Sequence, residues 1–292
     1  MNNELIKILK ERNIHPISYK RIKSVYIINN KYVIKLNTNN YDIYKYLISK
    51  DFLYFPKNFN NINDNYDMSL YIDNIKVNNS ELINDYIKII SILHFKTSYK
   101  REIDLDEIKE KYEKIYNRIL SLKVYYQDLN DKIDHETFFS PSEYLLIRNI
   151  SLIYSILDNS IVLLDKLYKR VKEEKSFRIS LLHNNVNLEH LIVGDSKCLI
   201  SWDKSSFDSP IYEIESIYRK YFKIIDLSDL IAIYELNNRL TMEEKCLLLV
   251  NLSIPNNLEL TNNTYSDTKI INREITYLKK VYELLIKYEN EL

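Results

Sequence analysis

The sequence predicts an α+β fold, in which a small antiparallel β lobe is followed by a large, mainly helical lobe that contains one β-hairpin. Up to about residue 76, short runs of β-branched and aromatic residues alternate with polar ones and are separated by Asn-rich turns. After residue 80, apolar residues recur at helical spacing over long stretches. One stretch, His183–Glu213, interrupts the helices with two β-type segments around Gly194. We therefore expect a β-rich lobe over residues 1–76 and a helical lobe over 77–292, with 183–213 at its centre.

Composition and charge exclude several classes of protein. The chain has 292 residues, enough for one large domain or two lobes. Lys and Arg total 41, as do Asp and Glu, so no net field favours a nucleic-acid partner. No stretch approaches the roughly 18 apolar residues that a membrane span needs, and the N-terminus lacks the apolar run of a signal peptide. We expect no nucleic-acid partner, no membrane span and a cytoplasmic location, with Cys198 and Cys246 as small core residues.

The glycine content excludes the common phosphate-binding loops. Average usage of ~7% corresponds to about twenty glycines in a chain of this length, yet there is one. Such loops need glycine because the backbone must approach the phosphates closely and adopt positive φ. The sequence therefore contains no Walker A loop, no Rossmann fingerprint and no Gly-rich kinase loop.

The first lobe is predicted to contain strands on both sides of a short helix. An amphipathic helix over residues 4–13 ends before His15-Pro16. Asn29-Asn30 separates two β-type runs, which is typical of a hairpin whose turn tolerates positive φ. The expected strands are Ser18–Ile22, Ser24–Ile28, Lys31–Leu36, Phe52–Phe55 and Met68–Ile72, with a helix at Tyr41–Ser49 and a loop at Asn58–Asn65.

The second lobe is predicted to be built from long helices. The first begins after Ser80, a good N-cap, and a later one begins at Ser140-Pro141, where proline is tolerated in the first turn. The other expected helices are Glu107–Asp131, Glu143–Glu174, Tyr212–Phe222, Leu227–Asn238, Met242–Asn251 and Ile270–Glu289. Between the last two, Pro255–Asp267 is expected to be a loop.

The order of elements and the central stretch resemble the aminoglycoside phosphotransferase and choline kinase-like family, which has the protein-kinase-like fold. Within it, the pattern is most similar to the bacterial spore-coat-associated branch. The family carries a His-Gly-Asp stretch, then an Asn, an Ile-Asp-Trp-Glu segment and an Asp-Pro-x-Tyr-Asp-Leu segment. The matching text here is His183-Asn184-Asn185, His190, Ile200-Ser201-Trp202-Asp203 and Ser209-Pro210-Ile211-Tyr212-Glu213-Ile214, and the helix Ile87–Tyr99 resembles a family helix that ends in Leu-His.

The resemblance implies three catalytic positions, and all three carry other residues here. Asn185 stands at the position of the catalytic base, where an amide has no basic lone pair at neutral pH. His190 replaces a metal-binding Asn, although magnesium prefers hard oxygen ligands. Ser201, a neutral hydroxyl, replaces the main metal-binding Asp. Ordinary kinase-type phosphoryl transfer requires these groups to orient the acceptor and hold magnesium.

Other positions in the same stretch leave alternatives open. Asp203 matches a second family acid and shares a face with Ser201 if the segment is extended, so it is a candidate metal ligand. Alternatively, it caps a turn or pairs with Lys204. His183 matches a residue that is mainly structural in the family. For His190 the alternatives are a buried, hydrogen-bonded ring and a ligand to zinc or another metal.

In the first lobe, Lys35 stands where the family carries its phosphate-contacting lysine. That lysine pairs with a helical Glu, but the chain has no Glu between Glu11 and Glu81, so only Asp42 or Asp51 could serve, on a shorter side chain. The turn at Lys23 has no glycine and would place bulky side chains near a nucleotide's phosphates. An exposed strand lysine is the alternative role for Lys35.

These substitutions predict a pseudokinase: a protein of the phosphotransferase family that serves as a binding, scaffold or regulatory module. The resemblance to the spore-coat-associated branch implies another protein as its partner, in a spore-associated assembly. The substitutions predict no cofactor. The alternative is an active small-molecule phosphotransferase that uses Asp203 and Lys35 with ATP and magnesium.

Overall fold

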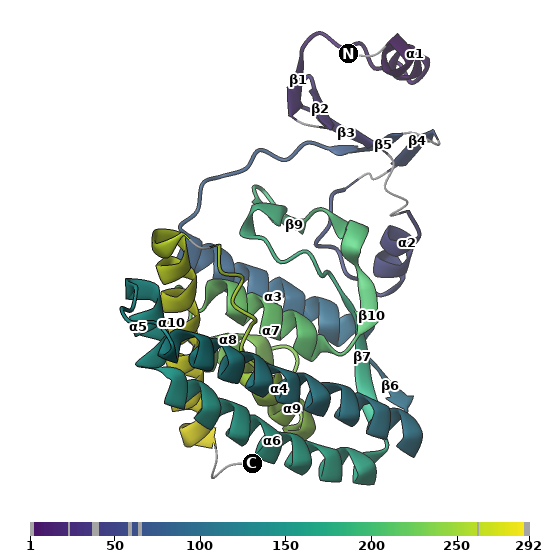
Figure 1. The fold of residues 1–292 in the computed structure, drawn as a ribbon. Helices are drawn as coiled ribbons and strands as arrows, with labels where there is room; N and C mark the ends of the chain where they lie inside the picture. Colours follow the sequence, from purple (N-terminus) through teal and green to yellow (C-terminus); the bar gives the residue numbers. More distant parts are fainter. Residues whose placement is uncertain are drawn as a thin grey trace. The chain divides into compact units, whose positions relative to one another are not determined.

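The computed structural model describes residues 3–22, 24–36, 41–57, 60–63, 66–261 and 263–288. It confirms the predicted fold class, a small antiparallel sheet followed by a large helical part with one short hairpin (Figure 1). The chain forms two compact units. Unit 1 comprises Met1–Ser98, Ser180–Asp208 and Ile224–Asn238, and unit 2 comprises Tyr99–Ile179, Ser209–Lys223 and Arg239–Leu292. The lobe boundary expected between residues 76 and 77 lies inside unit 1, and the division into lobes there stays a prediction.

Unit 1 begins with a five-stranded sheet in the order β1-β2-β3-β5-β4, in which every neighbouring pair is antiparallel. The predicted Asn29-Asn30 turn joins β2 and β3, and both residues adopt positive φ, 53° and 50°. The Asn29 side chain also accepts hydrogen bonds from the backbone N–H groups of Ile17 and Ser18. The strands are β1 (Tyr19–Ile22), β2 (Val25–Ile28), β3 (Tyr32–Leu36), β4 (Asn60–Asn63) and β5 (Tyr66–Leu70). Lys23, where the sequence predicts a tight turn, lies outside the described residues.

The first helix, α1 (Asn3–Glu11), covers one face of this sheet. Its buried Leu5 and Leu9 pack in one apolar cluster with Ile28, Ile34 and Met68 of β2, β3 and β5. Because side chains alternate along a strand, the neighbours of these residues in sequence point to the opposite face of the sheet. That opposite face carries the polar side chains of the candidate site.

The predicted strand at Phe52–Phe55 is wrong, and so is part of the loop predicted at Asn58–Asn65. Residues 52–55 form no strand, whereas Asn60–Asn63 form β4; residues 58, 59, 64 and 65 lie outside the described residues. The aromatic residues serve ring packing instead, since the Phe52 ring lies 5.9 Å from that of Trp202. Tyr54 contributes its carbonyl oxygen, which accepts a hydrogen bond from the Leu199 N–H at 2.8 Å.

The single glycine is required by a close approach of two backbone segments. Gly194 joins β8 (Leu191–Val193) to β9 (Lys197–Leu199), and a Cβ atom there would lie 2.7 Å from the carbonyl oxygen of Asp73. The hairpin is also hydrogen-bonded to the segment at residues 72–75, because the Ile75 N–H donates to the Val193 carbonyl at 2.7 Å. Gly194 therefore seats the hairpin on residues 72–75, and its φ is not positive.

The remaining described elements of unit 1 include the long helix α3. Asn78, two residues before the expected Ser80, caps the long helix α3, and its side-chain oxygen accepts from the Ser80 N–H. These elements are α2 (Tyr41–Ser49), α3 (Asn79–Thr97), the end of β7 (Ser176–Leu182), the 3₁₀ turns η1 (Leu188–His190) and η2 (Trp202–Lys204), β10 (Ser206–Asp208) and α8 (Leu227–Glu235).

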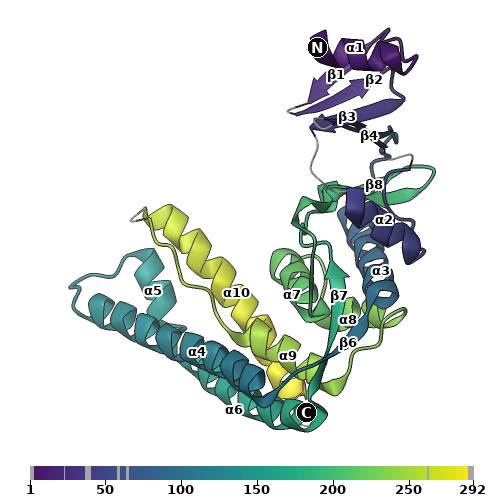
Figure 2. The ribbon, with the colours of Figure 1, turned by 90° about the vertical axis from the view of Figure 1, so that its right-hand side faces the viewer.

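Unit 2 is mainly helical, with α4 and α6 side by side in both views (Figures 1 and 2). The helix predicted at Glu143–Glu174 is two helices, separated at Arg148 and Asn149. Asn149 donates its side-chain N–H to the Leu145 carbonyl, a local bond that competes with the helical backbone pattern. The elements are β6 (Tyr99–Glu102), α4 (Leu105–Asp134), α5 (Pro141–Ile147), α6 (Ile150–Glu174), α7 (Pro210–Tyr221), α9 (Met242–Ser253) and α10 (Thr264–Tyr288).

Both cysteines are buried, as predicted for core residues. Within the described ranges, no single helix has the length and apolar character to cross a membrane. The bent pair α5 and α6 reaches those limits together, by length and composition only.

Candidate functional site

A cavity of about 310 Å³ lies in unit 1, on the face of the sheet opposite α1. It brings together three of the residues that the sequence pointed to: Lys35, Ser201 and Asp203. The cavity is also lined by Val25, Val33 and Asp67. Asn185 and His190 do not line it, although they lie close by in the chain's central loop.

Lys35 is half-buried on β3, so it is not an exposed strand lysine. Burial lowers the pKa of Lys35 because it penalises the ammonium form, and the negative charge of Asp203 offsets part of that effect. Asp67 acts in the same direction as Asp203. The cavity therefore holds one cation with two carboxylates near it.

Asp67 is the site residue that the sequence analysis missed. It lies directly opposite Lys35 in the antiparallel register of β3 and β5, and it is 4% exposed. The expected alternatives are not placed there, since Asp51 forms an ion pair with Lys96 at 2.7 Å and Asp42 is exposed on α2. The β3–β5 register would have revealed Asp67, but a helix and an Asn-rich segment separate these strands in the sequence.

Ser201 and Asp203 reach the cavity through an unusual backbone bend. Ser201 adopts a left-handed conformation (φ 68°, ψ 61°) at the start of η2, which is uncommon for a residue with a side chain. The bend is anchored by the fully buried Trp202, whose indole N–H donates to the Leu199 carbonyl at 2.9 Å. Asp203 is exposed, and among the residues with described positions it forms no ion pair with Lys204.

The Asn185 side chain is hydrogen-bonded to the backbone. Its side-chain N–H donates to the Ser201 carbonyl at 3.1 Å. The Asn185 carbonyl in turn lies 3.0 Å from His190 Nδ1, which must therefore carry the proton and donate it. These bonds tie the loop before η1 to the bend at Ser201.

The histidines of this stretch are held by hydrogen bonds. His183 is 0% exposed, its Nε2 lies 2.9 Å from the Ile200 carbonyl, and its ring contacts that of Trp202 edge-on. His190 is half-buried. Over the described parts of the chain, no three His, Cys, Asp or Glu side chains gather into a metal-binding cluster. A hydrogen-bonded role accounts for the positions of both rings.

The donor set at the cavity fits magnesium poorly. Magnesium prefers an octahedron of hard oxygen ligands with carboxylates among them. Asp203 supplies one exposed carboxylate, Ser201 supplies a neutral hydroxyl, and Asp67 is buried opposite Lys35. Lys35 could meet a phosphate oxygen, but the volume is near the lower end of small-molecule pockets, which span about 300–1,000 Å³.

Comparison with known proteins gives no sequence-level match. No family model and no curated protein matches the chain. Solved structures do match in shape. The aminoglycoside phosphotransferase from Alicyclobacillus acidocaldarius has a TM-score of 0.68 at 9% identity, covering 94% of this chain and 92% of that one. The AMP-bound spectinomycin phosphotransferase APH(9)-Ia has a TM-score of 0.54 at 14% identity, covering 96% and 97%.

These two likenesses span nearly the whole of each chain. At such low identity they establish the fold and leave the chemistry to the residues of this chain. The chain has the fold of the aminoglycoside phosphotransferases.

Proposed function

We propose that the chain is a pseudokinase, a protein of phosphotransferase-like fold that acts as a binding, scaffold or regulatory module. The observation that carries the proposal is the state of Asn185. Its amide stands at the position of the catalytic base, has no basic lone pair, and donates its N–H to the Ser201 carbonyl. An acceptor hydroxyl would find no proton acceptor at this residue.

The rate contributions of a general base and of metal ions are large, so losing both predicts a large loss of activity. A positioned general base contributes about 10²–10⁴ in rate, and metal ions stabilise the transferring group by several kcal/mol more. Kinases turn over at about 1–100 per second. Because His190 and Ser201 replace the other two catalytic residues as well, we expect roughly 10⁻³ per second or slower, after allowance for non-additive effects.

Calorimetric titration with ATP and GTP, with and without magnesium, tests this proposal. We expect no binding that depends on magnesium, because the cavity offers a single exposed carboxylate. Lys35→Met serves as the control that identifies binding at this cavity. Magnesium-dependent nucleotide binding that Lys35→Met abolishes would contradict the proposal.

The alternative is an active ATP-dependent phosphotransferase with an unusual site. The observation that favours it is the presence of Lys35 and Asp203 in one cavity, with Asp203 near enough to affect the lysine's pKa. Its test is ATP consumption with hydroxylated and aminated acceptors, comparing Asp203→Ala with Asp208→Ala, an exposed acid on β10. Activity that is present in the unmodified chain and in Asp208→Ala but lost in Asp203→Ala would support the alternative. No activity in the unmodified chain would exclude it.

The proposed partner is another protein, and the proposed setting is the cytoplasm of a spore-forming cell. The resemblance of the central stretch to the spore-coat-associated branch motivates this part. Immunodetection of the chain in purified spore-coat fractions checks it. Its absence from those fractions, with presence in vegetative cytoplasm, would contradict the spore association.

A further inference from the structure

The cavity of unit 1 is lined by ionic and polar side chains that the protein does not use elsewhere. Lys35 and Asp203 both line it, yet neither belongs to a salt bridge within the described ranges. Three serines in the lining, Ser24, Ser69 and Ser201, place their hydroxyls in no hydrogen bond with another described residue. Five side chains therefore line one cavity with their bonding capacity available to a ligand.

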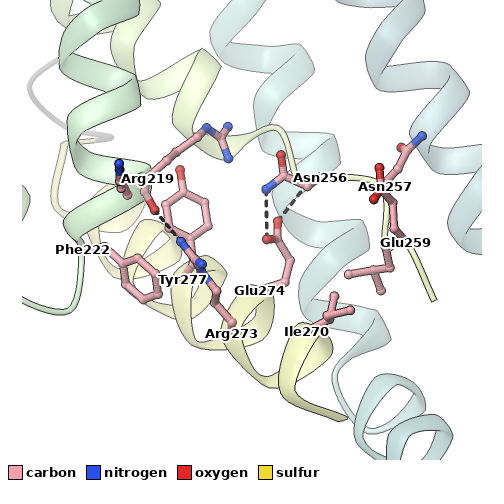
Figure 3. Close-up of a pocket in the computed structure, with 11 residues that line it drawn as sticks. Arg219, Phe222, Asn256, Asn257, Glu259, Ile270, Arg273, Glu274 and Tyr277 are labelled. Atoms are coloured by element: carbon pink, nitrogen blue, oxygen red, sulfur yellow. Dashed lines mark hydrogen bonds between the residues drawn. The ribbon is translucent and has the colours of Figure 1, made fainter. Parts of the chain in front are cut away.

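The larger cavity of unit 2 differs in this respect. It has a volume of about 460 Å³ and is shown in Figure 3. Glu274 receives two hydrogen bonds from Asn256, and the Arg273 side chain donates to the Arg219 carbonyl (Figure 3). These ionic side chains are already bonded to the protein, in contrast to the cation and the exposed acid of the unit 1 cavity.

Strand register explains why the polar groups of unit 1 meet. Lys35 lies opposite Asp67, and Val33 lies opposite Ser69, in the antiparallel pairing of β3 and β5. Because residues two apart on a strand share a face, these four side chains lie on the face of the sheet that α1 does not cover. The bend at η2 supplies a further acid and a further hydroxyl. The cavity is therefore built by segments that are distant in the sequence.

The charges of the lining disfavour ligands that carry charge of one sign only. In the described lining, Lys35 is the cation, and Asp67 and Asp203 are the acids. Both carboxylates would repel the several negative charges of a nucleotide triphosphate. A ligand with only an ammonium group would leave the lysine without an acceptor. A molecule that carries one group of each sign meets neither difficulty.

Lys35 in particular would gain from a bound carboxylate. Burial penalises its ammonium form and lowers its pKa, and the charge of Asp203 offsets only part of that effect. A carboxylate beside the ammonium group would supply charge-assisted hydrogen bonds. Asp203 is exposed, so its carboxylate is accessible to the ammonium group of a ligand.

We infer that the cavity of unit 1 binds small zwitterions, molecules of the amino acid type that carry one carboxylate and one ammonium group. The carboxylate meets Lys35, the ammonium group meets Asp203, and the serine hydroxyls bond to either group. This assignment rests on the proposed function of a binding module, because both concern the same site. The volume of about 310 Å³ is at the lower end of small-molecule pockets, about 300–1,000 Å³, and suits a ligand of this size.

Titration calorimetry with zwitterions of increasing length, using the full chain, tests this site. Glycine, β-alanine and γ-aminobutyrate carry the same two charges on carbon spacers of increasing length, so the tightest binder reports the spacing that the site prefers. Propionate and ethylamine are β-alanine without its ammonium group and without its carboxylate. Each should bind about tenfold more weakly than β-alanine or worse, because one set of charge-assisted hydrogen bonds is lost.

Substitutions assign each charge of the ligand to one residue. Lys35→Met and Asp203→Asn should each weaken binding of the tightest zwitterion about tenfold or more. Lys35→Met should weaken propionate and spare ethylamine, and Asp203→Asn should do the reverse. The controls Lys20→Met on β1 and Asp208→Asn on β10 make the same exchanges at exposed positions outside the lining and should leave binding unchanged. Thermal unfolding of each variant confirms that it is folded.

The outcomes separate this inference from the proposed function. Zwitterion binding that both substitutions weaken and both controls keep supports the inference. Binding that neither substitution weakens, or that is no tighter than the binding of propionate and ethylamine, would overturn it. Absence of zwitterion binding at millimolar concentration would also overturn it, and would leave the pseudokinase proposal in place. That proposal is contradicted separately, by magnesium-dependent ATP binding that Lys35→Met abolishes.

Discussion

Lys35 and Asp67 lie directly opposite each other on adjacent antiparallel strands, β3 and β5. In protein kinases the corresponding lysine pairs with a glutamate on a helix, and the position of that helix controls the pair. Here the acid belongs to the same sheet as the lysine. The register of the strands sets their separation, so no movement of α2 is needed to bring them together.

The burial of Lys35 predicts a particular dependence of stability on pH. Its pKa is lowered in the folded state by burial, so between the folded pKa and the unfolded value near 10.4 the unfolded chain binds more protons. The free energy of unfolding of the unmodified chain should therefore rise with pH over this window, relative to Lys35→Met. Urea unfolding of both chains at several pH values up to about 10.5 measures the difference. A free energy of unfolding of the unmodified chain that falls relative to that of Lys35→Met as pH rises would contradict it.

Gly194→Ala should destabilise the protein. The added Cβ would lie 2.6 Å from a methyl carbon of Ile72 and 2.7 Å from the Asp73 carbonyl oxygen. Either the β8–β9 hairpin or the segment at residues 72–75 must therefore move. Overpacking of this kind costs about 1–3 kcal/mol. Denaturant unfolding measures the loss, and Asp195→Ala, an exposed change in the same turn, is the control. Equal stability of the two variants would show that the contact is not tight.

Tyr234→Phe should also destabilise the protein, through buried polar groups of unit 1. The Tyr234 hydroxyl lies 2.9 Å from His94 Nδ1 and accepts a hydrogen bond from the Asn238 side chain at 2.8 Å. All three residues are nearly fully buried. Removing the hydroxyl leaves the His94 ring and the Asn238 side chain without this hydrogen-bond partner, at a cost of about 1–3 kcal/mol. Thermal unfolding compares it with Tyr265→Phe on an exposed tyrosine, which should change little.

The two thiols should be unreactive in the folded protein. Burial raises the pKa of both Cys198 and Cys246 to about 11, so roughly a thousandth of each is thiolate at pH 8. Iodoacetamide at pH 8 should label neither cysteine until denaturant unfolds the chain. Mass spectrometry of the labelled peptides measures this, and rapid labelling of either residue without denaturant would show local exposure.

The sequence predicted those features that local chemistry determines. Asn29 and Asn30 tolerate positive φ, so the hairpin between β2 and β3 followed from two adjacent residues. Phe52–Phe55 has the composition of a strand, but its rings pack against residues distant in sequence, so local propensity gave the wrong element.

The candidate site also has residues that the sequence predicts and residues that depend on contacts between distant parts of the chain. Lys35, Ser201 and Asp203 were predicted through the resemblance, and the fold brings all three to one cavity. Asp67 could not be found in this way, because its place opposite Lys35 depends on strand register across a long separation in sequence. The break at Asn149 depends on one side-chain hydrogen bond that competes with the helix.

The central claim is that this chain has lost ordinary phosphoryl transfer. The most direct measurement is the rate of ADP release by the unmodified chain, with ATP, magnesium and a panel of hydroxylated and aminated acceptors. We predict a rate of roughly 10⁻³ per second or slower with every acceptor. A rate of about 1 per second or more with any acceptor, abolished by Asp203→Ala and kept by Asp208→Ala, would contradict the account.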